Sequence, residues 1–315
     1  MIDLLPTRRE VCVGALAAMT SASPWAGTAT AAERPAAEPF GYCLNTSTIR
    51  EQKLSLPEKI DVIAKAGYQG VEPWVRELDQ YVQEGGSLAD LGKRIRQHGL
   101  RVESVIGFFE WIVDDDPRRA KGLEEARRCM DMVRQIGGTR IAAPPVGATQ
   151  QRDLSLPKAA ERYRALLEVG DSIGVVPELE LWGFSTTLGR LGEVAQVAIE
   201  AGHPKACLLL DVYHLYKGGS KLEGLRLLNG AALPVLHFND YPADPPRAAI
   251  TDAHRVYPGD GVAPLRPLLR DLRDIGFRGM LSLELFNREY WMQDALTVAR
   301  IGLEKMRAVV RASLS

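Results

Sequence analysis

One pattern repeats along most of the sequence: a helical stretch ends at a glycine, and a short apolar segment follows within a few residues. Glycine tolerates the left-handed backbone conformation that ends many helices, so each of these glycines marks a helix end. The repeat limits the chain to alternating helices and strands, which is typical of an α/β protein. The six clearest junctions are Ala66-Gly67, His98-Gly99, Gly137-Gly138, Ile173-Gly174, Ala201-Gly202 and Ile275-Gly276.

Eight strands are predicted, and several are continuous apolar runs such as Cys207-Leu208-Leu209-Leu210, which are typical of parallel strands buried on both faces. Eight strands alternating with helices favour a closed barrel, so we expect an α/β fold with a single (β/α)8 TIM barrel domain over residues 40–315. An open doubly wound sheet is the alternative, but no glycine-rich phosphate loop follows the first strand. The expected strands are 40–45, 68–73, 102–107, 139–143, 175–181, 207–212, 235–239 and 279–285.

The first residues indicate an export signal. Thr7-Arg8-Arg9 precedes a short apolar run, and Ala29-Thr30-Ala31 offers a cleavage site of small residues. The paired arginines resemble a twin-arginine (Tat) signal, although the usual continuation after them is missing. We expect a Tat-like signal peptide at 1–31, a linker at 32–39 and an exported, periplasmic bacterial protein. A cytoplasmic extension is the alternative.

The overall charge excludes some partners. The chain has 39 basic and 40 acidic residues, a net charge of −1, which gives no electrostatic footprint for nucleic acid or an anionic membrane surface. No stretch reaches the roughly 20 apolar residues of a membrane-spanning helix, so no membrane contact is expected after signal removal. The four cysteines lack disulfide or zinc-ribbon spacing and are expected to be small buried hydrophobes. A homo-oligomer stays open.

Acidic and imidazole groups collect where the predicted strands end, which is where TIM barrels carry their chemistry. Glu180, Asp211 and Glu284 lie in or directly after apolar strand sequence, and His237 lies between Leu236 and Phe238. Carboxylates in such positions are costly to bury unless they are paired or bind a cation. Three carboxylates and one imidazole suit one divalent ion, Mn, Mg, Co or Zn. Structural ion pairs are the alternative reading.

The motifs around these residues resemble the sugar phosphate isomerase/epimerase family of the xylose-isomerase-like TIM-barrel superfamily. The resemblance covers roughly residues 40–310 and implies that Glu180, Asp211, His237 and Glu284 hold the metal. It also implies substrate contacts for His214 and Arg255, while Glu72 and His254 are further candidates for substrate binding. The motifs are Glu180-Leu181-Trp182-Gly183, Asp211-Val212-Tyr213-His214, His237-Phe238-Asn239-Asp240, Arg255-Val256-Tyr257-Pro258-Gly259-Asp260-Gly261 and Leu283-Glu284-Leu285-Phe286-Asn287.

The resemblance implies a metal-dependent isomerase or epimerase of a sugar or keto-sugar. Glu180 and Glu284 are the expected catalytic residues, which transfer a proton through a metal-stabilised enediolate. The expected partner is therefore a small-molecule sugar or keto-sugar. Aromatic residues are expected to form apolar walls in the loops after the strands, namely Trp74, Phe108, Phe109, Trp111, Trp182 and Tyr257.

Three other functions stay open. A dehydratase, lyase or hydratase acting on a keto-sugar or related polyol could use the same metal site. An endonuclease IV-like enzyme shares the fold, and Asp252-Ala253-His254 resembles part of its third zinc site. The places where that enzyme has further histidines hold Glu72-Pro73-Trp74 and Gly107-Phe108-Phe109, which argues against it. A non-catalytic sugar-binding barrel is the last alternative.

Overall fold

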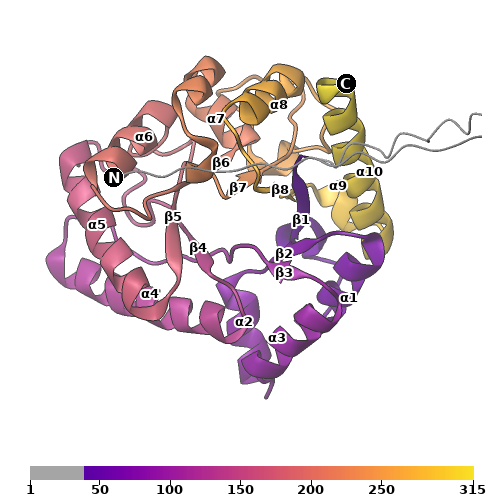
Figure 1. Ribbon diagram of the computed structural model, residues 1–315, viewed down its shortest axis with the longest axis horizontal. Coiled ribbons are helices and arrows are strands. Elements are labelled where there is room, and N and C mark those ends of the chain that lie inside the picture. Colours follow the sequence, from indigo (N-terminus) through magenta and orange to yellow (C-terminus); the bar gives the residue numbers. More distant parts are fainter. Residues whose placement is uncertain (1–38) are drawn as a thin grey trace, which may run out of the picture. The chain divides into compact units, whose positions relative to one another are not determined.

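The computed structural model describes residues 39–315, which form the barrel shown in Figure 1. The expected signal peptide, Cys12 and nearly all of the expected linker lie outside the described residues. The strands occupy the centre of Figure 1 and the helices surround them. The strands are β1 (Gly41–Asn45), β2 (Gly70–Glu72), β3 (Arg101–Val102), β4 (Arg140–Ala143), β5 (Val176–Glu180), β6 (Leu208–Asp211), β7 (Val235–His237) and β8 (Met280–Leu283).

Helices separate the strands along the chain, as the repeat in the sequence indicates. The α-helices are α1 (Leu56–Ala66), α2 (Val75–Gln83), α3 (Leu88–Gln97), α4 (Asp116–Gln135), α5 (Leu156–Ile173), α6 (Leu191–Glu200), α7 (Val212–Gly218), α8 (Leu265–Asp274), α9 (Arg288–Trp291) and α10 (Ala295–Leu314). Short 3-10 turns are η1 (Thr46–Ile49), η2 (Leu222–Leu227), η3 (Gly230–Ala232) and η4 (Asp252–His254). Over residues 39–315, no helix combines the length and the apolar character needed to cross a membrane.

All strands run parallel in the order β3-β2-β1-β8-β7-β6-β5-β4, so the first and last strands of the chain are neighbours. Between β3 and β4 the backbone N–H of Ala142 donates to the carbonyl of Val105 at 2.9 Å. The expected TIM barrel is therefore confirmed.

Strand β3 is shorter than the predicted 102–107, because its ladder with β2 ends at Val102. Beyond it, Ile106 makes only an isolated bridge to Trp74.

The junction glycines end their helices as predicted. Gly67, Gly99, Gly137, Gly174, Gly202 and Gly276 all have positive φ, between 59° and 94°. At Gly67 the N–H donates to the carbonyls of Ala64 and Ile63, which closes the last turn of α1. The cysteines of the barrel, Cys43, Cys129 and Cys207, are free and buried, as expected.

Tyr163 of α5 ties the helix layer to two strands. Its buried hydroxyl can donate to the carbonyl of Pro177 (2.9 Å) or Cys207 (3.0 Å), and it accepts the N–H of Cys207 (3.2 Å). Tyr163→Phe removes the acceptor of the buried Cys207 N–H, whereas the Cys207 carbonyl keeps the N–H of Leu179, so we expect a loss of about 1–3 kcal/mol in the free energy of unfolding. Urea unfolding measures it. Tyr81→Phe, at a partly exposed tyrosine of α2, is the control; equal losses in both variants would contradict the assignment.

Candidate active site and metal centre

The four expected metal ligands follow four consecutive strands. Glu180, Asp211 and His237 are the last residues of β5, β6 and β7, and Glu284 directly follows β8. All four side chains are buried. Because the strands are parallel, their carboxyl ends meet at one end of the barrel, which brings residues up to about a hundred positions apart into one cluster.

Three of the four residues converge on one point. Asp211, His237 and Glu284 each offer a ligand atom, and these atoms all lie within 4.8 Å of one another. The Nδ1 atom of His237 lies 3.2 Å from Oε2 of Glu284 and 3.6 Å from Oδ2 of Asp211. Glu180 is outside this group of three. Its buried Oε2 has no hydrogen-bond partner among residues 39–315.

The ring of His237 is oriented from behind by a carboxylate. Its Nε2 atom lies 3.0 Å and 3.2 Å from the two oxygens of Glu72. Within the described chain the opposite ring atom, Nδ1, is buried and makes no hydrogen bond, so it is left to face Asp211 and Glu284. A carboxylate that fixes the far nitrogen of a histidine is the usual support of a metal-ligating imidazole.

Glu72, which the sequence suggested as a substrate contact, is held by three protein side chains. Its fully buried carboxylate accepts hydrogen bonds from Asn45 Nδ2 (2.9 Å) and the hydroxyl of Ser282 (2.8 Å), in addition to its contact with His237. Asn45 Nδ2 also donates to Oε1 of Glu284 at 3.1 Å. The position of Glu72 fits the orientation of His237, and its contact with a substrate stays a prediction.

Two residues of the motif after β7 hold neighbouring groups in place. Asn239 donates to Oδ2 of Asp211 at 3.1 Å and accepts the N–H of Tyr213 at 3.0 Å. Asp240 accepts the N–H groups of Gly259 and Gly261, which shapes the turn after Arg255. Sequence reasoning quoted both residues within a motif but gave neither a role.

Arg255 bridges the carboxylates of the cluster. Its buried guanidinium donates through Nη1 to Asp211 Oδ2 and Glu284 Oε2, both at 2.7 Å. Through Nη2 it contacts Asp252 Oδ1 at 2.5 Å and His214 Nε2 at 3.2 Å. The residue expected to bind a substrate oxyanion thus lies directly beside two of the expected metal ligands, where it compensates their charge.

The two remaining candidate histidines differ in position. His214 is buried, its Nε2 accepts from Arg255, and its Nδ1 has no hydrogen-bond partner within residues 39–315. His254 is partly exposed, and its Nδ1 contacts the hydroxyl and N–H of Thr251 within its own turn. Only His214 therefore joins the cluster around Arg255.

A family model described as a xylose isomerase-like TIM barrel matches residues 60–309, well over half of the sequence. The chain belongs to the xylose isomerase-like TIM barrel family. A solved structure described as the IolI protein with a binding zinc atom has a TM-score of 0.81 and 23% identity, and covers 88% of this chain and 100% of that one. This likeness shows the same fold.

Relatives of this family member are named for three kinds of activity. Inosose isomerase from Bacillus velezensis is 27% identical over 275 residues, 85% of this chain and 96% of the relative. Fructoselysine 3-epimerase from Escherichia coli O157:H7 is 23% identical over 277 residues, 84% and 96% of the two chains. A 3-dehydroshikimate dehydratase from Pseudomonas putida is 25% identical over 235 residues, 74% of this chain and 36% of that protein. They support an enzyme of the isomerase, epimerase or dehydratase type.

The two glutamates expected to be catalytic in this family member have pKa values shifted in opposite directions. Burial raises the pKa of Glu180 to about 8, and the charges of Glu284 and Asp211 add to the rise. Burial would also raise the pKa of Glu284, but His237 and Arg255 outweigh it and lower that pKa. Burial opposes the charging of His237, yet Glu284 and Glu72 raise its pKa well above the ordinary value. The cluster therefore stabilises positive charge at His237.

Glu178 lies two residues before Glu180 on β5 and is also buried. Burial raises its pKa to about 8 as well. The hydroxyl of Ser104 donates to its Oε2 at 2.5 Å, and Arg140 lies 3.9 Å from its Oε1. Glu178 thus pairs with Ser104 and Arg140, although its Oε1, like Oε2 of Glu180, makes no hydrogen bond within residues 39–315.

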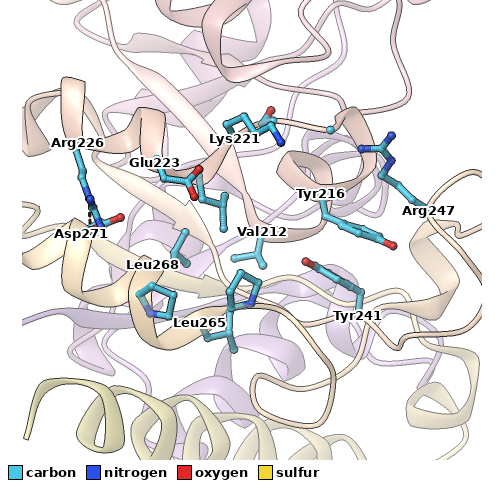
Figure 2. Close-up of a pocket in the computed structure, with 15 residues that line it drawn as sticks. Val212, Tyr216, Lys221, Glu223, Arg226, Tyr241, Arg247, Leu265, Leu268 and Asp271 are labelled. Carbon is cyan, nitrogen blue, oxygen red and sulfur yellow. Dashed lines mark hydrogen bonds and ion pairs between the residues drawn. The ribbon is translucent and has the colours of Figure 1, made fainter.

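A separate pocket of about 340 Å³ lies between α7, η2 and α8 (Figure 2). The rings of Tyr216 and Tyr241 stack at its side at 4.0 Å, and Arg226 pairs with Asp271 at 2.9 Å. Val212 and Tyr216 line it, and residues four apart share one face of a helix, so the pocket lies on the other side of α7 from His214. Its described lining contains none of the candidate site residues.

Proposed function

We propose that this protein is a divalent-metal-dependent isomerase or epimerase of a sugar or keto-sugar. The observation that carries the proposal is the ring of His237, whose Nε2 is held by Glu72 while its buried Nδ1 faces Asp211 and Glu284. A buried imidazole nitrogen that faces two buried carboxylates, and whose far ring nitrogen is held by a third, fits a shared cation. The isomerase and epimerase relatives point to the same reaction class.

The donor set fits one divalent ion. Asp211, His237 and Glu284 would hold it, and Glu180 is the fourth candidate because its Oε2 is buried without a hydrogen bond inside the described barrel. Oxygen and imidazole donors suit Mn, Mg, Co or Zn. When bound, such an ion supplies Lewis-acid polarisation of a carbonyl oxygen, which makes the neighbouring C–H more acidic.

Two glutamates would move the proton. Glu180 is the first, because its buried Oε2 has no hydrogen-bond partner within residues 39–315 and can accept a proton, as a general base must. Glu284, which directly follows β8 and belongs to the group with Asp211 and His237, is the second carboxylate, for the return step. Arg255 and His214 would orient substrate oxygens, since their polar atoms lie beside Asp211 and Glu284.

Elemental analysis of the purified protein tests the metal site. We expect about one divalent ion per chain and its loss in His237→Ala, because the variant removes one of three convergent ligands. His254→Ala is the matched control and should keep the ion, since His254 contacts only its own turn. Circular dichroism verifies the fold of both variants. Equal metal content in all three proteins, or none in any after incubation with Mn²⁺, Co²⁺ or Zn²⁺, would refute the site.

The same protein, incubated with keto- and aldo-sugars in D2O, reports the reaction. An isomerase or epimerase exchanges a carbon-bound proton with solvent and leaves the molecular mass otherwise unchanged. A dehydratase removes one water molecule from the substrate, so the product mass falls by that of water. The dehydratase alternative is favoured by the relative from Pseudomonas putida and by the buried Nδ1 of His214, which can donate a proton to a leaving hydroxyl. Mass spectrometry of the product separates the two.

We further propose export to the periplasm, supported by Arg8, Arg9 and the small residues at 29–31. Free or keto-sugars would then be the substrates rather than sugar phosphates, which are scarce outside the cytoplasm. Recovery of the full-length chain in the cytoplasmic fraction alone would overturn this proposal.

A further inference from the structure

Six rings form a continuous chain around the candidate active site. Five stand on the loops after β2, β3, β5 and β8 and one on α7, and the centroids of neighbouring rings lie 5.2–6.0 Å apart. Such spacings are those of aromatic pairs in contact. We call this chain the aromatic arc, and its members in order are Phe286, Trp74, Phe108, Trp182, Phe184 and His214.

Both ends of the aromatic arc meet Arg255. The guanidinium carbon of Arg255 lies 5.1 Å from the centroid of Phe286, and its Nη2 lies 3.2 Å from Nε2 of His214. Arg255 in turn contacts Asp211 and Glu284. The arc and Arg255 therefore enclose a ring-shaped rim, and this rim borders the carboxylates that would hold the metal.

Only part of the aromatic arc is available to a ligand. Trp74 is 7% exposed, and the guanidinium carbons of Arg50 and Arg76 lie 4.3 Å and 4.6 Å from its ring centroid. Phe108 and Phe184, by contrast, are 44% and 43% exposed. Exposed phenyl rings next to a polar cluster are the usual mark of a binding surface.

Three of the six rings expected to form apolar walls belong to the aromatic arc, namely Trp74, Phe108 and Trp182. Phe109, Trp111 and Tyr257 are buried and pack within the core, so they do not reach the rim. Phe184, which that set lacks, supplies the ring next to His214. The free ring surface is thus concentrated at Phe108 and Phe184, on either side of Trp182.

We propose that the substrate carries a second ring, which packs on Phe108 and Phe184 while the hydroxy ketone reacts beside Asp211 and Glu284. This inference rests on the proposed function and names its substrate class: a glycoside or other two-ring conjugate rather than a single monosaccharide. The second ring can be a sugar, which offers an apolar C–H face, or an aromatic group, because both stack on a phenyl ring.

Isothermal titration calorimetry with non-reacting probes tests the proposal without turnover. The probes are methyl β-D-glucoside (one ring), cellobiose (a second sugar ring) and phenyl β-D-glucoside (an aromatic ring). We expect at least one two-ring probe to bind about five- to tenfold more tightly than the one-ring probe, in keeping with the energy of one aromatic contact. The Phe108→Ala/Phe184→Ala variant should lose this difference. Val82→Ala, at a side chain that is also 44% exposed, is the control and should keep it.

The pattern of binding identifies the second ring. A gain with cellobiose alone indicates a sugar ring, and a gain with phenyl glucoside alone indicates an aromatic one. Equal affinities for all three probes, no binding of any probe, or a gain that survives in the double variant would overturn the inference. So would a double variant that changes only the oligomeric state, since the rings would then cover a second copy of the chain. Metal content and proton exchange, measured in the same preparation, show independently whether the proposed function stands.

Discussion

Replacing Glu180 with glutamine is expected to lower proton exchange with D2O by about 10²–10⁴-fold, the usual contribution of a general acid or base. Glutamine keeps the shape and burial of the side chain but cannot take up a proton. The Oε2 atom of Glu180 has no hydrogen-bond partner in the described chain, so its loss leaves no protein group unpaired. The exchange rate of the substrate C–H signal in 1H NMR measures the effect.

Glu178→Gln is the matched control for this prediction. Glu178 and Glu180 belong to the same strand, both are buried, and burial raises the pKa of each to about 8. Only Glu178 accepts a hydrogen bond from Ser104. We expect Glu178→Gln to retain exchange within about tenfold. A larger loss of exchange in Glu178→Gln than in Glu180→Gln would mean that Glu178, not Glu180, transfers the proton. Elemental analysis of both variants separates the loss of the base from the loss of the metal.

Replacing Arg255 with methionine should destabilise the metal-free protein by about 3–5 kcal/mol, because it leaves buried charges without their partner. Arg255 Nη1 donates to both Asp211 and Glu284, and all three side chains are buried. Urea unfolding in the presence of EDTA measures the loss. Arg94→Met is the control: Arg94 pairs with Asp61 at the surface, where such pairs contribute about 0–1 kcal/mol.

The pH dependence of the stability lost in Arg255→Met shows whether Arg255 stabilises the fold through its charge or through its packing. Burial acts to raise the pKa of Asp211, but Arg255, His237 and His214 together outweigh it and hold this pKa below its ordinary value, with Arg255 the largest of the three. A carboxyl with a lowered folded-state pKa contributes stability that is present above its unfolded pKa and is lost as the pH falls. The difference between Arg255→Met and the parent should therefore persist from pH 7.5 to about pH 5 and shrink as the pH falls below about 3.9, the ordinary pKa of an aspartate. An unchanged difference would mean that Arg255 acts through packing alone.

Divalent ions give a second check on the same variant. An ion that binds Asp211 and Glu284 supplies the positive charge that methionine lacks, and it stabilises the folded state in proportion to its affinity. We expect added Mn²⁺ or Zn²⁺ to recover part of the lost stability in Arg255→Met. No recovery at concentrations that load the parent protein would argue against a shared site.

Local sequence patterns determined the barrel and the outline of its site. All six junction glycines have the positive φ that the pattern predicts, and each observed strand overlaps its predicted range. Asp211, His237 and Glu284 were found because a charged group at the end of an apolar strand is a local signal. Strand alternation and helix ends depend on neighbours in the sequence, so a single sequence suffices to read them.

Only the tertiary structure decided which side chains meet. The contact of Glu72 with His237 joins residues 165 positions apart, and that of Asn45 with Glu284 joins residues 239 positions apart. The placement of Arg255 between two carboxylates, and of Phe108 and Phe184 at the rim, likewise follows from loops on different strands. Barrel closure fixes these distances, because it sets the stagger between the strands. The sequence of one strand does not indicate its stagger relative to another.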